Sequence, residues 1–422
     1  MLYKEGFSLL PIGELITRNK EKEIIEDDGL YKQVTIKLYG KGVIQRGNDL
    51  IVGKTIGTKN QYRVSNGQFI MSKIDARNGA FGIVPEELEG AITTQDFLSY
   101  NINEDVILPQ FFVLITASKR FNELCQKASS GTTGRQRVNE KEFLGFTIPV
   151  PSKTLQLEIL SNYNSKILEA NQLYQKANHL EIESTAFFLK KLSLPPLGRV
   201  KVKKRFELFK YKDLERWDVF SSDNAIYNEL KNSKNQVQCL GDYFSFTKRA
   251  WSKKIETKEY FDYIEIGGVD PLFGIKESTK TLTKKAPSRA SQTVKENDLI
   301  IGTTRPYLKR FAIVGNQHDG QVCSSGFSVI EPKSNYNLSF LKIYLMSDYG
   351  IEQLKNQMSG ALYPAITISK LKDILIPIPP KKDQDLIVSK VEAMKSDAMQ
   401  FLKKSEHLRE TALNEFESEI FY

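Results

Sequence analysis

One short motif occurs twice in this chain, and the repeat constrains the fold more than any other feature. The first copy, Phe143–Pro151, ends in Ile-Pro-Val-Pro, and the second copy, Leu371–Pro379, ends in Ile-Pro-Ile-Pro. In each copy a glutamine follows the second proline by five residues, at Gln156 and Gln384. The copies lie 228 residues apart in a chain of 422 residues, so the repeat predicts two tandem halves of similar fold.

Each motif leads into a long segment that we expect to form one helix, from about residue 154 to 192 and from about 383 to 422. Proline fits the first turn of a helix, so the motif ends a strand and begins a helix. Apolar and small residues then recur with heptad spacing, as in a coiled-coil seam. The predicted seam comprises Ile159, Tyr163, Ala170, Leu173, Ala177, Leu180 and Phe187 in the first helix and Ile387, Val391, Met394, Ala398, Phe401, Leu408 and Ala412 in the second.

A heptad helix needs a partner to cover its seam, and the other copy is the nearest one available. The intervening residues let the chain return, so we expect an antiparallel intramolecular coiled coil of helices about 60 Å long. The alternative is that each helix packs only on its own globular part.

The globular parts also repeat. Residues 64–84 align without gaps with residues 294–314, and the alignment continues to Phe97 and Phe327. Apolar positions are shared, whereas Lys73, Asp75 and Arg77 correspond to Thr303, Arg305 and Tyr307. Two related modules of different specificity would show this pattern, and so would neutral drift. Short strands broken by Gly, Asn and Asp turns fill both parts.

These observations predict an α+β fold with two tandem α/β domains and a pseudo-two-fold repeat. The expected boundaries are residues 1–151 for the first domain, 152–195 for the first helix, 196–380 for a basic linker and the second domain, and 381–422 for the second helix.

Composition sets broad limits on function. The net charge of +9, from 60 basic and 51 acidic residues, is compatible with a polyanionic partner. The three cysteines, Cys125, Cys239 and Cys323, are scattered, which indicates a reducing compartment without structural zinc. The first twenty residues are too charged for a signal peptide, and the longest apolar runs are too short to span a bilayer. We therefore expect a soluble cytoplasmic protein without a membrane partner.

In each half an amphipathic helix is expected next, over residues 109–127 and 338–358. A loop follows each of them, at residues 129–137 and 359–365. Glycines and hydroxyls in the first loop, with Arg135 and Arg137, have a phosphate-contacting composition. The alternative is a helix C-cap followed by a solvated turn, especially in the second loop, which lacks arginine.

Catalytic motifs are weak throughout. Residues 47–55 resemble a phosphate-binding loop with one residue too many, and the same pattern in the second half favours a strand and a turn. Glu256–Thr257–Lys258 matches only the tail of a nuclease motif. The three histidines lack metal-ligand spacing, and His179 and His407 are expected on the helix surface. We therefore expect no catalytic, cofactor-binding or metal-binding residues in this chain.

The repeated Pro-x-Pro motif with its glutamine, the Ser-Gly loop and the heptad helices together resemble the specificity (S) subunit of type I restriction–modification systems. The resemblance covers essentially the whole chain. It implies two target recognition domains, each of which reads one half of a bipartite double-stranded DNA site. It implies that the coiled coil sets the half-site spacing and docks two methyltransferase (M) subunits, and that motor-nuclease (R) subunits join for cleavage. S-adenosylmethionine, ATP and Mg²⁺ would then belong to the partner subunits, and this chain would not be an enzyme.

Under this resemblance, basic and amide side chains on loops would read bases while other cations grip phosphates. The second loop has Tyr363–Pro364–Ala365 in place of arginines, so equal DNA contacts are not expected in the two halves. For any single candidate, a solvated surface position is the alternative reading. The DNA-binding candidates are Lys73, Arg77, Lys54, Lys59, Arg63, Arg135 and Arg137 in the first half and Arg305, Tyr307, Lys309, Arg249, Lys253 and Lys254 in the second.

Two other functions stay open from the sequence. The chain could be a free-standing DNA-cleaving enzyme with an unrecognised active site, in which case the chain alone would turn over DNA. It could also be a structural coiled-coil protein with accessory domains, in which case it would not retain DNA selectively.

Overall fold

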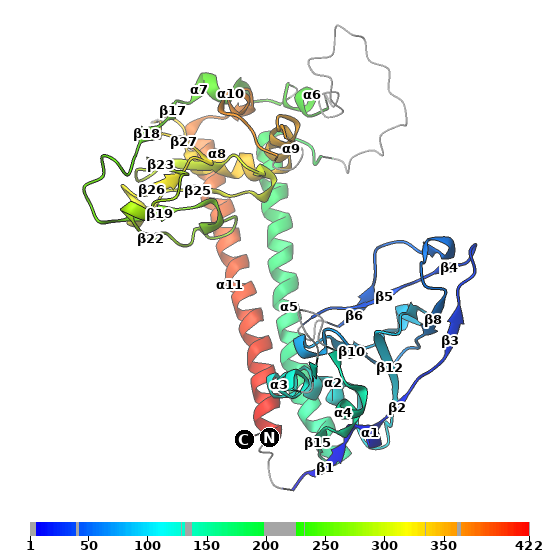
Figure 1. The fold of residues 1–422 in the computed structure, drawn as a ribbon. Helices are drawn as coiled ribbons and strands as arrows, with labels where there is room; N and C mark the ends of the chain where they lie inside the picture. The colour runs from blue at the N-terminus through cyan, green and yellow to red at the C-terminus, as the bar shows by residue number, and fades with distance from the viewer. Residues whose placement is uncertain are drawn as a thin grey trace. The chain divides into compact units, whose positions relative to one another are not determined.

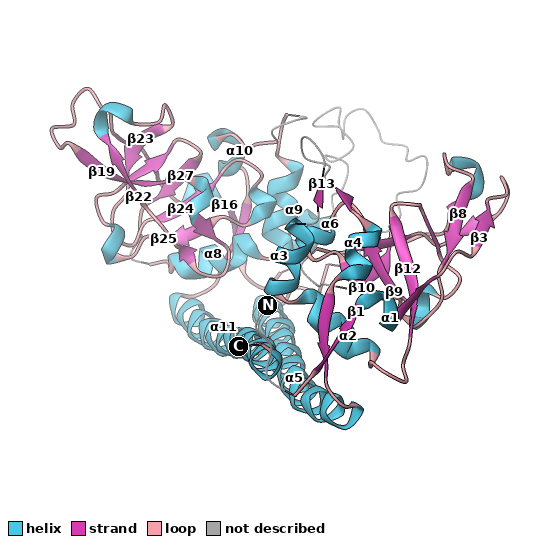
Figure 2. Ribbon diagram, turned by 60° about the horizontal axis from the view of Figure 1, so that its bottom comes forward, coloured by secondary structure: helices cyan, strands magenta, loops and turns pink. Residues whose placement is uncertain are grey.

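The computed structural model describes residues 6–38, 42–127, 129–130, 137–197, 225–231, 233–333, 335–360 and 364–421. The chain divides into two compact units, unit 1 (Met1–Tyr174 and Leu402–Tyr422) and unit 2 (Gln175–Phe401). Each unit contains its own sheets and helices (Figure 1 and Figure 2). Each of the two long helices is therefore shared between the units. The predicted loop residue Arg135 and most of the predicted linker, residues 198–224, lie outside the described residues.

The two predicted long helices are present. Helix α5 spans Lys153–Leu192 and helix α11 spans Lys381–Ile420 (Figure 1). The amide of Leu155 donates to the Ser152 hydroxyl at 3.4 Å, which caps the start of α5. The helix ends at Leu192, and the next residue, Ser193, has a left-handed φ of 57°, shortly before two prolines.

The two helices pack on each other in antiparallel fashion, as predicted. In unit 1 the last turns of α11 lie along the first half of α5, where the Ser405 hydroxyl donates to the Ala170 carbonyl at 2.7 Å. In unit 2 the first turns of α11 meet the second half of α5, since Val391 and Phe188 belong to one core. Among the predicted seam residues, Ile159, Ala170, Leu173, Ala177, Ile387, Val391, Ala398 and Ala412 are buried, and Tyr163, Leu180, Phe187, Met394, Phe401 and Leu408 are partly buried.

Each unit has a four-stranded sheet of the same order. In unit 1 the order is β10-β9-β12-β2, and in unit 2 it is β25-β24-β27-β17. The pairing is antiparallel in both, with Phe69 opposite Ile83 and Leu299 opposite Ile313, so the predicted alignment of the halves is confirmed. The strands are β2 (Ile16–Arg18), β9 (Phe69–Ser72), β10 (Phe81–Ile83) and β12 (Phe97–Ile102), then β17 (Phe246–Thr247), β24 (Leu299–Gly302), β25 (Phe311–Ile313) and β27 (Phe327–Ile330).

The Ile-Pro-x-Pro strand pairs with the first strand of its own half. Strand β15 (Thr147–Val150) pairs with β1 (Ser8–Pro11), and β28 (Leu375–Ile378) pairs with β16 (Gln236–Cys239). Proline lacks an amide proton, and a two-stranded ribbon, in which both strands are edges, tolerates it. The motif thus joins the two ends of each domain just before the long helix begins.

A second sheet in each unit differs between the two. In unit 1 this sheet has three strands, in the order β11 (Ile92–Thr93), β8 (Asn60–Arg63) and β3 (Lys22–Ile24). Two ribbons accompany it, β4 (Leu30–Tyr31) with β7 (Ile51–Val52) and β5 (Val34–Ile36) with β6 (Val43–Gln45). In unit 2 the second sheet has five strands, in the order β18 (Arg249–Ala250), β23 (Ala290–Thr293), β26 (Val322–Ser324), β19 (Tyr260–Ile264) and β22 (Thr279–Leu282). Its hairpin joins β20 (Val269–Asp270) to β21 (Gly274–Ile275).

The single helix predicted in each half is in fact two helices. A serine interrupts it, Ser118 between α2 (Pro109–Ala117) and α3 (Lys119–Lys127) and Ser347 between α8 (Leu338–Met346) and α9 (Asp348–Asn356). The hydroxyl of each serine accepts an amide proton of the following helix, from Phe121 at 3.2 Å and from Gly350 at 3.4 Å. Hydrophobic periodicity does not reveal such a break, because the apolar face continues across it.

Short helices and one ribbon complete the fold. They are α1 (Ile12–Leu15), α4 (Glu140–Gly145), α6 (Ala225–Lys231), α7 (Leu240–Tyr243) and α10 (Ile368–Lys372), with β13 (Ser129–Ser130) paired to β14 (Arg137–Val138). The core of unit 1 is built on stacked aromatic rings around Phe69, Phe81 and Phe143. At the positions of Phe69 and Phe81 unit 2 has Leu299 and Phe311, within a more aliphatic core.

Candidate nucleic-acid interface

The segment after the central strand is held in the same way in both units. In unit 1 the Lys73 amide donates to the Asp96 carbonyl at 2.8 Å, and the Lys73 carbonyl accepts from the Val138 amide at 2.9 Å. In unit 2 Thr303 makes the two corresponding bonds, to Gly326 at 2.8 Å and from Ile366 at 2.9 Å. The predicted DNA-reading segments therefore occupy equivalent positions on a common frame.

In unit 1 this frame brings three predicted residues together, and we call Lys73, Arg77 and Arg137 the unit 1 patch. Arg77 lies in the 3₁₀ turn η2 (Ala76–Asn78), which packs beside β14, the strand that begins with Arg137. The Arg137 guanidinium lies 3.3 Å from the Asp96 carboxylate and is more than half exposed. Lys73 and Arg77 are partly exposed. The patch therefore presents cations that can contact phosphate or base edges.

In unit 2 the equivalent segment carries Arg305, Tyr307 and Lys309, which we call the unit 2 patch. The 3₁₀ turn η7 (Pro306–Leu308) lies between Arg305 and Lys309, whose φ angles of 48° and 55° are both left-handed. The Arg305 amide donates to the Pro364 carbonyl at 2.8 Å, which ties the turn to the loop after α9. Non-glycine residues in this conformation carry backbone strain, and such strain clusters at functional sites.

Three other unit 1 candidates, Lys54, Lys59 and Arg63, belong to other elements than the unit 1 patch. Lys54 is exposed in the turn η1 (Gly53–Thr55), and Lys59 donates to the Asp27 carboxylate at 2.6 Å. Arg63 on β8 donates to Glu23 at 3.0 Å, and this hydrogen bond raises the pKa of its guanidinium. Lys59 and Arg63 therefore have carboxylate partners inside the domain, and their contact with DNA stays a prediction.

Arg249 has a structural role in unit 2. Its guanidinium lies 2.6 Å from Asp298, which is fully buried, and 2.6 Å from Glu331. The hydrogen bond to Asp298 raises the pKa of Arg249. Lys253 and Lys254 are exposed in the loop after β18. Arg249 is thus held inside the domain, whereas Lys253 and Lys254 are accessible.

The weak catalytic motifs have structural roles. Residues 47–55 form β7 and η1, as expected for a strand and a turn. The Glu256 carboxylate accepts hydrogen bonds from the Trp251 indole N–H at 2.8 Å and from the Lys258 amide at 3.0 Å. The hydrogen bond from Trp251 lowers the pKa of Glu256. Within the described residues, no group of three or more His, Cys, Asp or Glu side chains could hold a metal ion. In the same part of the chain, every helix is too short or too polar to cross a bilayer.

The repeated glutamine has a role that the sequence did not reveal. Gln156 is buried, and its side-chain oxygen accepts from the Leu108 amide at 2.8 Å while its nitrogen donates to the Val106 and Pro151 carbonyls. Gln384 accepts from the Asn337 amide at 2.7 Å and donates to the Pro379 carbonyl at 2.7 Å. Each glutamine therefore ties the start of a long helix to the start of α2 or α8. The signal was its fixed distance from the motif, but its partners are far away in sequence.

Comparison with known proteins agrees with this architecture. A family model described as the Type I restriction modification DNA specificity domain matches residues 4–198 and 232–407. The type I restriction enzyme HindI specificity subunit of Haemophilus influenzae is 32% identical over 108 residues, which is 25% of this chain and 24% of that protein. That alignment therefore spans about a quarter of the relative's length.

Solved structures share the fold at low sequence identity. A chain from a structure on complex assembly and conformational transition of the type I R-M system matches with a TM-score of 0.53 and 14% identity, covering 99% of this chain and 98% of that one. The type I restriction-modification S subunit of M. genitalium gives a TM-score of 0.48 at 15% identity, covering 98% of this chain and 97% of that one. Because the family model covers both halves, the chain belongs to the type I restriction modification DNA specificity domain family.

Proposed function

We propose that this chain is the DNA-specificity subunit of a type I restriction–modification complex. Each globular domain reads one half of a bipartite duplex site, and the coiled coil sets the half-site spacing and docks two methyltransferase subunits. Motor-nuclease subunits join for cleavage, and S-adenosylmethionine, ATP and Mg²⁺ are bound by the partners. The chain itself does no chemistry and acts in the cytoplasm.

One observation carries the proposal. Lys73 and Thr303 are held by equivalent backbone hydrogen bonds, yet the side chains that follow them differ completely between the units. A common frame with different exposed side chains is what two readers of different half-sites require. Base edges are distinguished by side-chain chemistry, while frame and phosphate contacts only fix the position of the reader.

The chemistry of the two patches supports different half-sites. The unit 1 patch has two arginines and a lysine, and arginine donates two parallel hydrogen bonds to guanine in the major groove. The unit 2 patch has Tyr307 between two cations, and its ring is exposed enough to contact bases or sugars. Because Arg305 can bind guanine in the same way, we expect the two half-sites to differ where Arg77 of unit 1 corresponds to Tyr307 of unit 2.

The experiment is methylome sequencing of cells that express the chain with its methyltransferase subunits. The unchanged chain should yield one bipartite methylated motif. The double variant Lys73→Ala/Arg77→Ala should relax the motif at one half only, because removing a bidentate pairing with a base removes about 1–3 kcal/mol of discrimination. Arg305→Ala/Tyr307→Ala should relax only the other half.

Lys176→Ala is the matched control, because it removes an exposed cation from α5. This variant should leave both halves of the motif unchanged. Relaxation of both halves by either double variant would contradict the proposal, and DNA turnover by the purified chain alone would contradict its non-catalytic part.

A further inference from the structure

Both units carry a hairpin with nearly the same three residues beside its turn. In unit 2 the hairpin β20–β21 carries Leu272–Phe273–Gly274, and in unit 1 the hairpin β5–β6 carries Leu38–Tyr39–Gly40. The two hairpins occupy equivalent places, because β21 packs on β25 as β6 packs on β10. Tyr39 and Gly40 lie outside the described residues, so in unit 1 only the sequence of this turn is compared. The second sheets differ between the units, yet the residues of this turn are shared.

The turn of the unit 2 hairpin is held in one conformation. The Asp270 carboxylate accepts hydrogen bonds from the Leu272 amide at 2.8 Å and from the Phe273 amide at 3.1 Å. The same carboxylate lies 3.1 Å from the Lys276 ammonium group. Gly274 closes the turn with a left-handed φ of 71°, which glycine adopts at little cost. The hairpin is therefore a fixed projection from the domain.

The base of this hairpin is attached next to the unit 2 patch. Val269 of β20 is buried in the core that contains Ala312 of β25. Just before the hairpin, the Ile266 carbonyl accepts a hydrogen bond from the Arg310 guanidinium at 2.7 Å. Arg310 directly follows Lys309 of the patch in the chain. The hairpin and the patch are therefore fixed to each other through β25 and the residue before it.

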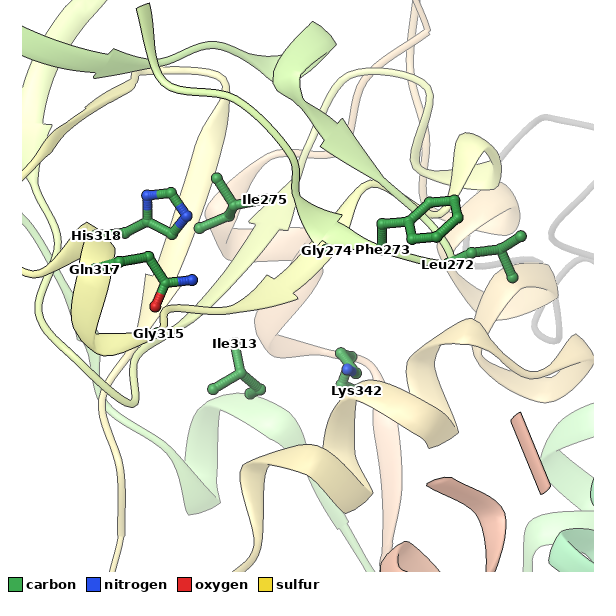
Figure 3. A pocket seen from close by; sticks show the side chains of 9 residues that line it. All are labelled: Leu272, Phe273, Gly274, Ile275, Ile313, Gly315, Gln317, His318 and Lys342. Carbon is green, nitrogen blue, oxygen red and sulfur yellow. The ribbon is translucent and has the colours of Figure 1, made fainter. Parts of the chain in front are cut away.

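The tip of the hairpin is apolar and exposed. Leu272 is 54% exposed and Phe273 is 46% exposed. Single exposed apolar residues are normal in proteins, but two neighbours on a rigid turn present one continuous apolar surface. Figure 3 shows the two side chains next to each other on the hairpin, with Lys342 of α8 below them, and all three line a cavity of about 200 Å³. The tip is thus accessible to a binding partner.

Cations lie beside the apolar tip. The Lys276 ammonium group is 4.7 Å from the centre of the Phe273 ring, and Lys342 borders the cavity below the tip. In the sequence of unit 1, Lys37 and Lys41 flank the corresponding three residues. An apolar tip between cations matches a partner that is apolar inside and anionic outside. Base pairs stacked between two phosphate backbones have this arrangement.

We propose that Leu272 and Phe273 form a wedge that inserts between two adjacent base pairs of the unit 2 half-site, unstacks them and kinks the duplex. This inference rests on the proposed function and adds a deformation of the DNA to it. An inserted apolar side chain covers the base faces that lose their stacking, and the kink brings more of the duplex against the protein. Pyrimidine–purine steps unstack most easily, so the wedge selects such a step without a hydrogen bond to a base.

The test uses the full chain in complex with its methyltransferase subunits and a duplex that contains the methylated motif. The unit 2 half-site is the half that Arg305→Ala/Tyr307→Ala relaxes. Aminopurine, a fluorescent adenine analogue that brightens when it is unstacked, replaces one base at a time across this half-site. The methylated adenine is left unchanged, because methyltransferases extrude their target base. The complex should brighten the analogue at one base step, and energy transfer between the duplex ends should report a bend of about 20–90°.

The variant Leu272→Ala/Phe273→Ala removes the wedge and leaves Val269 and Ile275, which anchor the hairpin on the sheet. It should abolish the fluorescence rise and most of the bend. Phe273→Tyr gives the turn the aromatic residue of unit 1 and should keep both signals. Ile368→Ala is the matched control, because it removes another half-exposed apolar side chain of unit 2, on α10. Hydrogen exchange of the β25 amides checks that each variant is folded.

The outcomes separate the wedge from the alternatives. A bright base step that the unchanged complex shows and Leu272→Ala/Phe273→Ala abolishes supports the wedge. A half-site that is bound without an unstacked base, or a bright step that persists in this variant, overturns it. Loss of methyltransferase binding by the variant would show that the tip contacts protein, and it would also overturn the wedge. A bipartite motif without a bright step refutes the wedge alone, whereas the absence of a motif refutes the proposed function.

Discussion

The two units share one frame, but a polar network beside it is neutral in unit 1 and charged in unit 2. Gln68 of unit 1 and Asp298 of unit 2 occupy the same position of the repeat, and each accepts the amide proton three residues earlier, at 3.1 Å and 2.7 Å. Gln68 is bonded further to Asn19 and Asn101, whereas Asp298 is bonded to Arg249. A neutral amide network has thus been replaced by a charged one without a change in the sheet. The fold of the frame therefore depends on which atoms accept and donate hydrogen bonds, and not on net charge.

Two turns likewise have the same backbone conformation in both units although their residues differ. Gly67 and Asn297 share a left-handed φ, of 80° and 67°, and Gly79 and Lys309 share one of 70° and 55°. Unit 1 uses glycine at both positions, where it costs little, and unit 2 uses residues with a Cβ atom. The geometry of these turns is therefore shared, and unit 2 carries the additional strain.

The largest expected effect is in the charged network of unit 2. Arg249→Ala leaves Asp298 buried without its cation, which should destabilise unit 2 by about 3–5 kcal/mol. Asn19→Ala in unit 1 removes only neutral hydrogen bonds and should cost about 1 kcal/mol. Hydrogen exchange of the strand amides in each unit measures the two separately. Lys253→Ala is the control, and comparable losses for Arg249→Ala and Asn19→Ala would contradict the distinction.

The repeated glutamines come next. Gln156→Leu leaves the Leu108 amide and two carbonyls unsatisfied in a buried place, so unit 1 should lose about 2–4 kcal/mol of unfolding free energy. Gln384→Leu should cost unit 2 less, since Gln384 donates to one carbonyl only. Denaturant unfolding with probes in each unit tests the order of the two effects. Gln172→Leu, at an exposed position of α5, should change stability by less than about 0.5 kcal/mol.

A smaller effect, of opposite sign, is expected at Lys309. Lys309→Gly places in unit 2 the residue that unit 1 has at this turn, and relief of the left-handed strain should stabilise unit 2 by about 1 kcal/mol. The reciprocal Gly79→Lys should destabilise unit 1 by a similar amount. Thermal unfolding in phosphate-free buffer measures both. A destabilised Lys309→Gly variant would show that the lysine contributes to the fold.

The smallest effect is expected at Asn297. Asparagine tolerates the left-handed region better than lysine does, so Asn297→Gly should stabilise unit 2 by only about 0.5 kcal/mol. Gly67→Asn should lower the stability of unit 1 by about as much. If both substitutions prove neutral, the two turns are equivalent in energy as well as in shape.

Much of the architecture could be predicted from the sequence. The motif at Ile148–Pro151 and Ile376–Pro379, followed by heptad spacing, predicted two long helices and their antiparallel pairing. The expected segments, 154–192 and 383–422, differ from α5 and α11 by at most two residues at either end. The alignment of residues 64–84 with 294–314 predicted strands that the structure pairs identically. The breaks at Ser118 and Ser347 were missed, because the apolar stripe runs through them.

The candidate interface was predictable only in part. The sequence placed Lys73, Arg77 and Arg137 among the DNA-binding candidates, and it also offered Arg63 and Arg249. In the structure Arg63 lies against Glu23, and Arg249 lies against Asp298. These carboxylates are 40 and 49 residues away in sequence, so the partnership could not be read from local spacing. The DNA contacts themselves stay predictions.

The sequence by itself determined the repeat, the seam and the turns, because these depend on periodicity and on the conformational preferences of Gly, Pro and Asn close to one another in the chain. The tertiary structure decided which cations are accessible and which are held inside a domain: Lys253 and Lys254 are exposed, whereas Arg249 lies against the buried Asp298. The reason is that charge pairing and desolvation depend on distance in space, which chain separation does not give. Two halves with one pattern can therefore carry different functions at the same positions.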